Sequence, residues 1–326
     1  MSGVKRPTEK HLMLFSGRAY PELAEEIAEL MGVELTSRRL ISYANSEVYV
    51  RYEESVRGSD AFVIQSHVSP VNEYLMEQLI MVDALKRASA KRITVVAPFY
   101  PYARQDKKHL GREPISARLV ADLYRAAGAD RIMSVDLHTA QIQGFFDGPL
   151  DHLSGMPVLA DYVEKKYDTK DMTIVSPDAG RVRLADNWSD RLHAPLAIIH
   201  KRHDPRVANQ VRVHEVVGRV EGRTCLIVDD MIDTAGTICQ AGEALRAHGA
   251  AKVIVATTHA ILSDPAQERL DAAGFEEVIC TNTLPIRKDI NIPSLTQLSI
   301  APLLAKAIHE VFEDGSVASL FPEKIG

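Results

Sequence analysis

The stretch Thr224-Cys-Leu-Ile-Val-Asp-Asp-Met-Ile-Asp-Thr-Ala-Gly-Thr237 decides the fold and the kind of site that this chain carries. Residues 225–228 form a short apolar run of the kind found in buried strands, and residues 238–247 have the periodicity of an amphipathic helix. Two adjacent carboxylates, Asp229 and Asp230, and a polar loop separate the two. A strand that leads through a loop into a helix is the repeating unit of α/β folds.

The loop before this helix has the features of a phosphate site. At a helix N-terminus, backbone N–H groups lack partners within the helix, and the helix dipole is positive there. Thr234 and Thr237 add hydroxyl donors, and Gly236 lets the backbone approach a ligand closely. Asp229 and Asp230 can accept hydrogen bonds from sugar hydroxyls, or reach a magnesium ion through water. The string therefore indicates a sugar phosphate; residues that only cap the helix are the alternative.

The composition is that of a globular protein with two domains of ordinary size. The chain has 326 residues, of which 46% are hydrophobic and 25% charged, as in ordinary globular domains. A net charge of −6 gives no support for binding nucleic acid or a membrane surface. We find neither a signal peptide nor an apolar run of membrane-spanning length. The three cysteines lack metal-type spacing, so we expect a cytoplasmic protein with reduced thiols.

Short apolar runs alternate with helical patterns along most of the chain. A helix is expected over residues 72–88, where apolar side chains line one face, and residues 47–52 alternate as in a hairpin or edge strand. The expected strands are residues 62–65, 93–97, 132–135, 174–175, 196–199, 225–228, 253–256 and 278–280. This alternation predicts an α/β protein with mainly parallel sheets, each flanked by helices.

One segment of the chain occurs twice. Residues 125–138 match residues 246–259 without a gap, and each copy reads as a helix end, a terminating glycine and a strand. Two related α/β domains, residues 1–155 and 156–326, are the economical explanation. Generic similarity between any two α/β units is the alternative.

The first half of the chain has a basic loop after an expected strand. Residues 100–112 contain Arg104, Lys107, Lys108 and Arg112. In open α/β sheets, ligands bind beyond the carboxyl ends of the strands, and Arg and Lys both suit phosphate. The loop therefore predicts an anion site, with a solvated surface loop as the alternative.

Acidic, histidine and basic residues follow three other expected strands. Asp136 and His138 would project to the same side of an extended segment and could share a hard metal such as magnesium. Asp178 follows a further strand on the expected ligand side. Lys201 and His203 end another strand, where Lys201, Arg202 and His203 suit a transferring phosphate. Helix capping and surface charge are the alternatives for each.

Together these motifs resemble one family, the ribose-phosphate pyrophosphokinases, which make 5-phosphoribosyl 1-diphosphate (PRPP). The resemblance rests on residues 45–47, 55–58, 101–108, 114–117, 136–147, 176–180, 200–201 and 228–237. It extends from about residue 12 to about residue 321, nearly the whole chain. The sugar-phosphate loop is shared with phosphoribosyltransferases, whereas the strings ARQDKK and DLH with QIQGFFD are much more specific.

The resemblance implies a fold, a reaction and a set of site residues. The fold would be two phosphoribosyltransferase-like domains, and the enzyme would transfer the β,γ-diphosphoryl group of ATP to the 1-hydroxyl of ribose 5-phosphate, with Mg²⁺. The ribose would contact Asp229 and Asp230, and the 5-phosphate Asp233, Thr234, Ala235, Gly236 and Thr237. ATP would contact Arg104, Gln105, Lys107 and Lys108. Its adenine would contact Tyr43, Asn45, Ser46 and Glu47 of a neighbouring subunit, which implies a homo-oligomer, and the family suggests a hexamer. The metal would involve His138, Asp178 and Asp136, and the catalytic residues would be Lys201 and His203.

The chain departs from the family pattern at several positions. Tyr43 replaces a Phe, which preserves stacking on adenine. Ala235 replaces a Gly or Cys, a change that is tolerable if φ at this position is negative. His109 and Leu110 make the ATP loop less polar. His203 replaces an Arg, and histidine is only partly charged near neutral pH and cannot fork onto phosphate.

Two other functions are compatible with parts of the sequence. A nucleotide-binding regulatory homologue without turnover would explain His203, although Lys201, Asp178 and His138 are intact. A phosphoribosyltransferase that consumes PRPP would use the sugar-phosphate loop, but it does not explain the basic loop of the first half.

Overall fold

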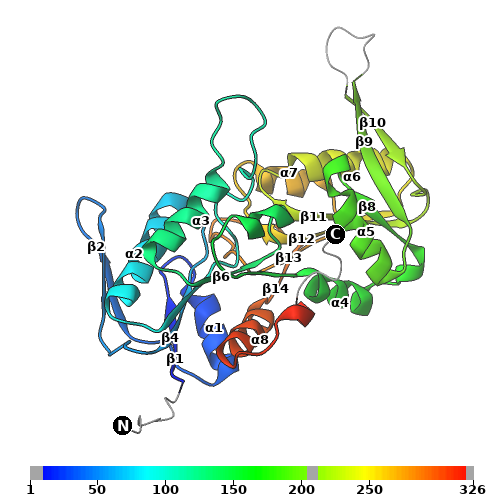
Figure 1. Ribbon diagram of the computed structural model, residues 1–326. Coiled ribbons are helices and arrows are strands. Elements are labelled where there is room, and N and C mark those ends of the chain that lie inside the picture. The colour runs from blue at the N-terminus through cyan, green and yellow to red at the C-terminus, as the bar shows by residue number, and fades with distance from the viewer. Residues whose placement is uncertain (1–9, 204–211, 321–326) are drawn as a thin grey trace, which may run out of the picture. The chain divides into compact units, whose positions relative to one another are not determined.

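The structure, a computed structural model, describes residues 10–203 and 212–320, and it divides them into two compact units (Figure 1). The first unit contains the described residues up to Leu153 and those from Ala301 onward; the second contains those from Ser154 to Ile300. The side chains of residues 201–203, 212–214 and 319 are not part of this description. Within the described residues, no helix is long and apolar enough to cross a membrane.

The first unit is built on a five-stranded, wholly parallel sheet in the order β1-β4-β5-β6-β7. Its strands are β1 (Leu12–Ser16), β4 (Asp60–Ile64), β5 (Arg92–Val96), β6 (Arg131–Val135) and β7 (Leu150–Leu153). Its helices are α1 (Pro21–Met31), α2 (Val71–Arg87), α3 (Ser116–Ala127) and α8 (Ala301–Phe312), with the short 3₁₀ turns η1 (Ala140–Gly144) and η4 (Ala318–Leu320). A separate hairpin pairs β2 (Arg38–Ser42) with β3 (Val48–Tyr52).

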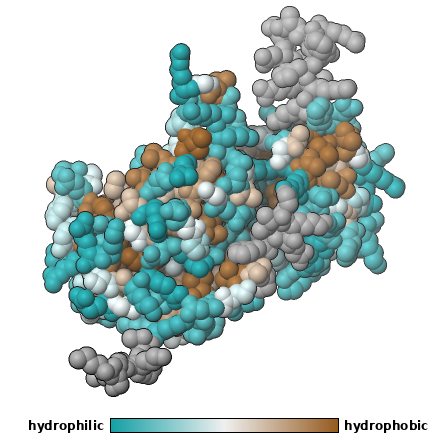
Figure 2. Space-filling view, viewed as in Figure 1, coloured by the Kyte–Doolittle hydropathy of each residue, from teal (hydrophilic) through white to brown (hydrophobic). Residues whose placement is uncertain are grey.

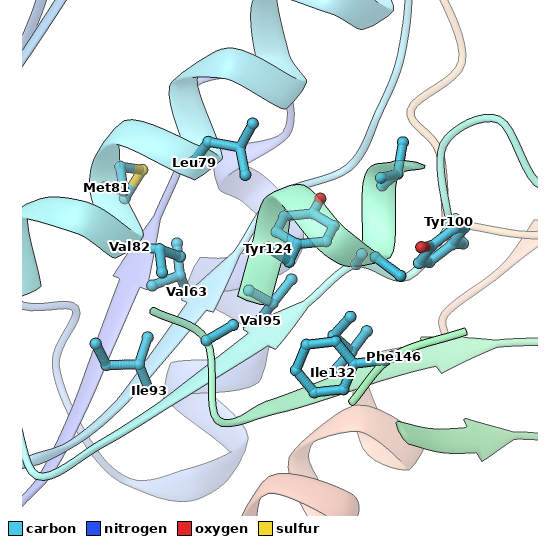
Figure 3. Packing of buried hydrophobic residues seen from close by; sticks show 14 of the residues in the cluster. Val63, Leu79, Met81, Val82, Ile93, Val95, Tyr100, Tyr124, Ile132 and Phe146 are labelled. Carbon is cyan, nitrogen blue, oxygen red and sulfur yellow. The ribbon is translucent and has the colours of Figure 1, made fainter. Parts of the chain in front are cut away.

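One core of this unit lies between the sheet and helices α2 and α3 (Figure 3). Alternate strand residues such as Val63, Val95 and Ile132 contribute to it, and Val82 of α2 and Tyr124 of α3 complete it. All of these side chains are buried. Alternation of side chains along each strand leaves residues such as Phe62 for the opposite face.

Helix α8 returns to the first unit and contacts α1. Leu304 and Ile308 of α8 are fully buried, as are Leu23 and Ile27 of α1. Beyond α8, Asp314 forms ion pairs with Lys10 and, at 2.6 Å, with Arg92. This differs from the division expected from the sequence, which assigned all of residues 156–326 to the second domain. The apolar face of α8 matches α1, and the sequence pattern of α8 alone does not reveal its partner.

The second unit is built on a seven-stranded sheet in the order β10-β9-β8-β11-β12-β13-β14. Only β10 is antiparallel to its neighbour; the other pairs are parallel. The strands are β8 (Met172–Ser176), β9 (Leu196–His203), β10 (Arg212–Val217), β11 (Thr224–Ile232), β12 (Lys252–Ala260), β13 (Glu277–Thr281) and β14 (Leu295–Leu298). The chain leaves β8 for β9 on one side and later returns to place β11 on the other side, so the strand order reverses between β8 and β11.

Helices cover both faces of this sheet. On one face lie α4 (Met156–Lys166) and α5 (Val182–Leu192), and on the other α6 (Gly236–Ala247) and α7 (Ala266–Ala273). The 3₁₀ turns η2 (Thr169–Asp171) and η3 (Ala179–Arg181) flank β8. Within β11, Leu226 and Val228 belong to the α4 and α5 core, whereas Cys225 and Ile227 belong to the α6 and α7 core. The continuous apolar run of β11 therefore reflects burial on both faces.

The elements expected from the sequence are present. Each expected strand overlaps a strand of the structure, the helix expected over residues 72–88 is α2, and residues 47–52 form β3 and the turn before it. In both copies of the repeat, a helix ends near a glycine with positive φ, Gly128 or Gly249, and a parallel strand follows. The prediction of an α/β fold with mainly parallel, helix-flanked sheets is confirmed.

A buried carboxylate, Glu277, joins three segments of the second unit. Tyr162 and Lys166 of α4 donate hydrogen bonds to it at 2.7 and 2.8 Å, and Tyr167 and Thr296 donate two more. Burial raises the pKa of Glu277, but these hydrogen bonds outweigh that effect and hold its pKa at about 2, below the ordinary 4.5.

We expect Glu277→Gln to lower the free energy of unfolding by about 2 kcal/mol near pH 7, because several hydrogen bonds to a charged acceptor are weakened. Since the folded-state pKa is depressed, the contribution of Glu277 is fully present above pH 4.5 and disappears as the pH falls toward 2. Urea unfolding at pH 7 and at pH 3 measures the difference, which should shrink at the lower pH.

Glu276→Gln is the matched control. Glu276 is the neighbouring residue and pairs with Lys252 at 3.2 Å, but both side chains are about half exposed. Exposed pairs contribute little, so this variant should unfold like the unmodified protein. An equal loss in both variants would contradict the role given to Glu277.

Candidate active site

The reversal of strand order between β8 and β11 marks the candidate site of the second unit. In open α/β sheets, ligands bind beyond the carboxyl ends of the strands at such a reversal. The ladder between β11 and β8 ends at the pair Ile227 and Val175. Asp229 and Asp230 follow on β11, just beyond that last pair, so the topology places both carboxylates at the position expected for a ligand.

A single arginine joins the two carboxylates. In Arg181, Nε lies 3.0 Å from Asp229 Oδ1, and Nη2 lies 2.8 Å from Asp230 Oδ1. The backbone N–H of Asp230 also donates to Asp229 Oδ1 at 2.8 Å. Burial and the neighbouring carboxyl group raise the pKa of Asp229 well above its ordinary value, and Arg181 opposes this shift.

Arg181 was missed in the sequence analysis. The interpretation of residues 176–180 stopped at Gly180, one residue too early. Asp178 accepts a hydrogen bond from Gly180 N–H at 2.8 Å and so begins the turn η3, and Arg181 ends that turn. An arginine three residues after Asp178 in a turn after a strand was the available signal, but its partners lie about 50 residues away on β11.

The expected phosphate loop joins β11 to α6. Residues 233–235 lead directly into the helix, whose first two residues are Gly236 and Thr237. Arg269 of α7 donates to the carbonyl of Thr234 at 2.8 Å. The guanidinium of Arg269 is so near that a Cβ on Gly236 would lie 3.3 Å from it. This second arginine, also missed in the sequence, supports the loop from the side of α7.

The condition under which Ala235 would be a tolerable replacement for Gly or Cys, a negative φ, is not met. Ala235 has φ 59° and ψ 3°, in the left-handed region, and its side chain is buried. The preceding residues must turn sharply to bring the loop into the first turn of α6, and a left-handed residue makes that turn. Alanine tolerates this conformation at a cost of about 1 kcal/mol.

In the first unit, the basic loop follows β5 and is tied to the segment after β6. Asp106 is buried, and its carboxylate accepts hydrogen bonds from Thr139 and, at 2.8 Å, from Gln141. The expected ATP residues around it are exposed: Arg104, Gln105, Lys107 and Lys108. One buried acid therefore holds the base of a loop whose cations face solvent.

The D-x-H segment is not extended, contrary to the sequence analysis. Strand β6 ends at Val135, and Asp136 has φ 37°, so the argument that Asp136 and His138 project to the same side does not hold. Between them, the Leu137 N–H donates to His152 Nε2 on β7 at 2.9 Å. His152 thus presents an unprotonated ring nitrogen that supports the turn.

The remaining expected residues fall into two groups. Tyr43, Asn45, Ser46 and Glu47 form the exposed tip of the β2–β3 hairpin, closed by a Tyr43 N–H to Glu47 carbonyl hydrogen bond of 2.8 Å. Lys201 and His203 lie on β9, opposite His214 and Arg212 of β10, and their side chains are outside the described part. Among the described residues, no three His, Cys, Asp or Glu side chains gather as a metal cage.

Fold and candidate site together define an α/β protein whose strand–loop–helix segment of residues 229–237 lies at a reversal of strand order. Comparison with known proteins narrows this class. Residues 12–128 match the model of the N-terminal domain of ribose phosphate pyrophosphokinase, and residues 205–322 match that of the phosphoribosyl synthetase-associated domain. The ribose-phosphate pyrophosphokinase of Streptomyces coelicolor is 63% identical over 324 residues, covering 99% of this chain and 100% of the relative.

Two mycobacterial proteins are similar to this chain over nearly its whole length. The ribose-phosphate pyrophosphokinase of Mycobacterium tuberculosis is 62% identical over 313 residues, covering 96% of each chain. The crystal structure of phosphoribosylpyrophosphate synthetase from Mycobacterium smegmatis has 59% identity and a TM-score of 0.89, covering 94% of this chain and 100% of that one. The chain belongs to the ribose-phosphate pyrophosphokinase family.

We expect Ala235→Val to disrupt the loop, because a β-branched residue with positive φ is strongly strained. The change should weaken ribose 5-phosphate binding at least tenfold, which isothermal titration calorimetry measures directly. Ala235→Gly should keep the loop, since glycine adopts positive φ freely.

Ala247→Val supplies the control for this experiment. Ala247 is the last, exposed residue of the same helix α6 and has no positive φ. Its substitution should leave binding unchanged. Unaltered binding in Ala235→Val would show that the left-handed residue is not needed to shape the loop.

Proposed function

We propose that this protein transfers the β,γ-diphosphoryl group of ATP to the 1-hydroxyl of ribose 5-phosphate, which yields PRPP and AMP for nucleotide biosynthesis. The observation that carries the proposal is the loop of residues 229–237 at the strand-order reversal of the second unit, in a chain of this family. A sugar phosphate suits that loop, and a diphosphoryl donor suits the basic loop of the first unit.

The acceptor is bound by the end of β11 and the loop before α6. Asp229 and Asp230 accept hydrogen bonds from the ribose hydroxyls. The 5-phosphate lies against the N-terminus of α6, where residues Asp233, Thr234, Ala235, Gly236 and Thr237 offer backbone N–H groups and two hydroxyls. Fixing the sugar in this way orients its 1-hydroxyl for in-line attack.

The donor is bound by exposed residues of the first unit. Arg104, Gln105, Lys107 and Lys108 contact the ATP phosphates, and buried Asp106 keeps the base of their loop in place. The exposed hairpin tip of Tyr43, Asn45, Ser46 and Glu47 recognises the adenine of a neighbouring subunit's ATP. An aromatic ring that is half exposed, as in Tyr43, is suited to stacking. This makes the protein a homo-oligomer, in line with the hexamer that the family suggests.

Magnesium would be bound together with the substrate phosphates. Asp178 and His138, with Asp136, are the side chains that would hold it. Mg²⁺ is usually held by one or two carboxylates, water and substrate phosphates rather than by a cage of side chains. The carboxylates of Asp178 and Asp136 therefore fit this ion, although the described residues contain no cage of three ligating side chains. When bound, it neutralises charge on the transferring phosphates.

Lys201 stabilises the charge that develops on those phosphates, with His203 beside it. Transfer of this kind depends mainly on positioning and on neutralising charge. The location is expected to be cytoplasmic, and the three cysteines, all buried and free, suit a reducing compartment.

The decisive experiment is a direct assay. The full-length protein is incubated with ribose 5-phosphate and magnesium ATP, and AMP and PRPP are quantified by chromatography. We expect equal amounts of both. Asp229→Asn should abolish most of the turnover. Tight ATP binding without AMP would instead support a regulatory homologue.

We expect His203→Arg to turn over faster than the unmodified protein. Arginine stays charged and can fork onto phosphate, whereas histidine loses its charge as the pH rises. The ratio of the two kcat values should therefore increase from pH 6 to pH 9. Equal rates throughout that range would refute the idea and assign the missing charge to another residue, such as Arg202 or Arg206.

A further inference from the structure

The pairing of Arg181 with Asp229 and Asp230 is an unusual arrangement for a sugar-binding site. The two acids are neighbours on one strand, and side chains that follow each other on a strand project to opposite faces. One guanidinium nevertheless contacts Oδ1 of both. This is possible because β8 has ended beside them, and Arg181, at the end of η3, enters the space beyond its last residue.

Burial makes a countercharge necessary. The side chains of Asp229 and Asp230 are only 12% and 7% exposed, and that of Arg181 is 19% exposed. Two neighbouring carboxylates out of water do not both stay ionised without a cation, because each disfavours the charge of the other. The pKa of Asp229 is raised for the same two reasons, burial and the neighbouring carboxyl group of Asp230. Arg181 is the cation whose contacts with both acids the structure describes.

The ion-pair geometry suits two carboxylates that act as a unit. A guanidinium presents donors in a rigid plane, so Nε on one acid and Nη2 on the other fix the spacing of the two groups. A carboxylate has about four lone-pair sites on its two oxygens, so pairing with Arg181 through Oδ1 is compatible with further hydrogen bonds from sugar hydroxyls. A lysine, with one compact charge, could not define both positions.

We propose that Arg181 is a positioning residue for the acceptor sugar: its guanidinium holds Asp229 and Asp230 in the arrangement in which both accept hydrogen bonds from the ribose hydroxyls. This inference rests on the proposed function, because it assigns the two acids to the sugar. It adds a residue from the turn η3 after β8 to an acceptor site that the sequence placed on β11 and the loop after it, and it predicts a defect confined to the acceptor.

The test is Arg181→Gln in the full-length protein. We expect the KM for ribose 5-phosphate to rise about tenfold, the scale of losing charge-assisted hydrogen bonds, whereas the KM for ATP changes less than twofold. Calorimetry without ATP should show the same tenfold weaker binding of ribose 5-phosphate. Arg181→Lys should lie between the two proteins, because it restores the charge but not the fork.

Arg191→Gln is the matched control. Arg191 lies on α5 of the same unit and also joins two carboxylates, with Nη2 2.7 Å from Asp161 Oδ1 and Nη1 paired with Glu164. These groups are more exposed and lie on helices α4 and α5, so this variant should keep both KM values. Thermal melting of all variants shows whether each is folded.

The outcomes separate this inference from the proposed function. If the unmodified protein forms no AMP, the proposed function fails, whatever Arg181 does. If it is active, an unchanged or lower KM for ribose 5-phosphate in Arg181→Gln overturns the inference, since a lower value would mean that Arg181 competes with the sugar. Equal increases in both KM values also overturn it, because they indicate general damage. For a Gln variant that does not fold, Arg181→Lys decides by the same criteria.

Discussion

Two nearly buried carboxylates on a strand, beyond the end of its neighbour, are the constraint on which the candidate site depends. Asp229 and Asp230 lie where β11 continues past its neighbour β8, and this position gives them both ligand access and burial. Access suits a ligand-binding role, whereas burial costs free energy, because a charge removed from water must be compensated. The turn after β8 provides that compensation through Arg181. The reversal of strand order, the length of β8 and the position of η3 all contribute to one arrangement of charges.

Several of the segments assigned to ligands contain a non-glycine residue with strained backbone. Ser46 in the hairpin tip, Tyr102 in the basic loop, Asp136 in the D-x-H segment and Ala235 in the phosphate loop all have positive φ. Such conformations cost about 1–3 kcal/mol each and persist where surrounding structure enforces them. The supports are visible: Asp106 binds the segment after β6, His152 binds the Leu137 N–H, and Arg269 binds the Thr234 carbonyl. Two buried side chains, Asp106 and His152, and the exposed Arg269 thus support the loops, while the cations of the basic loop are exposed.

Hydrophilic side chains cover most of the face seen in Figure 2, and the hydrophobic patches between them are separate. One group of buried hydrophobic residues in the first unit lies under α2 and α3, as Figure 3 shows for Val63, Val82 and Tyr124. In the second unit, buried hydrophobic residues lie on both faces of the sheet, and β11 contributes alternate residues to the two cores. The loops at the strand ends can therefore be polar and strained because stability comes from these buried layers.

The sequence by itself determined the α/β class, the strands β4, β5, β6, β8, β9, β11, β12 and β13, and the loop of residues 229–237, because these depend on local periodicity and on residue types that follow one another. It also indicated Asp178 and the basic loop, which directly follow their strands. Tertiary structure decided what depends on contacts between distant segments: the strand order that makes β8 and β11 neighbours, the return of α8 to α1, the left-handed Ala235, and the ion pairs of Arg181. Arg181 and Asp229 are far apart in the chain, and only the packing of two parallel strands brings their side chains within 3.0 Å.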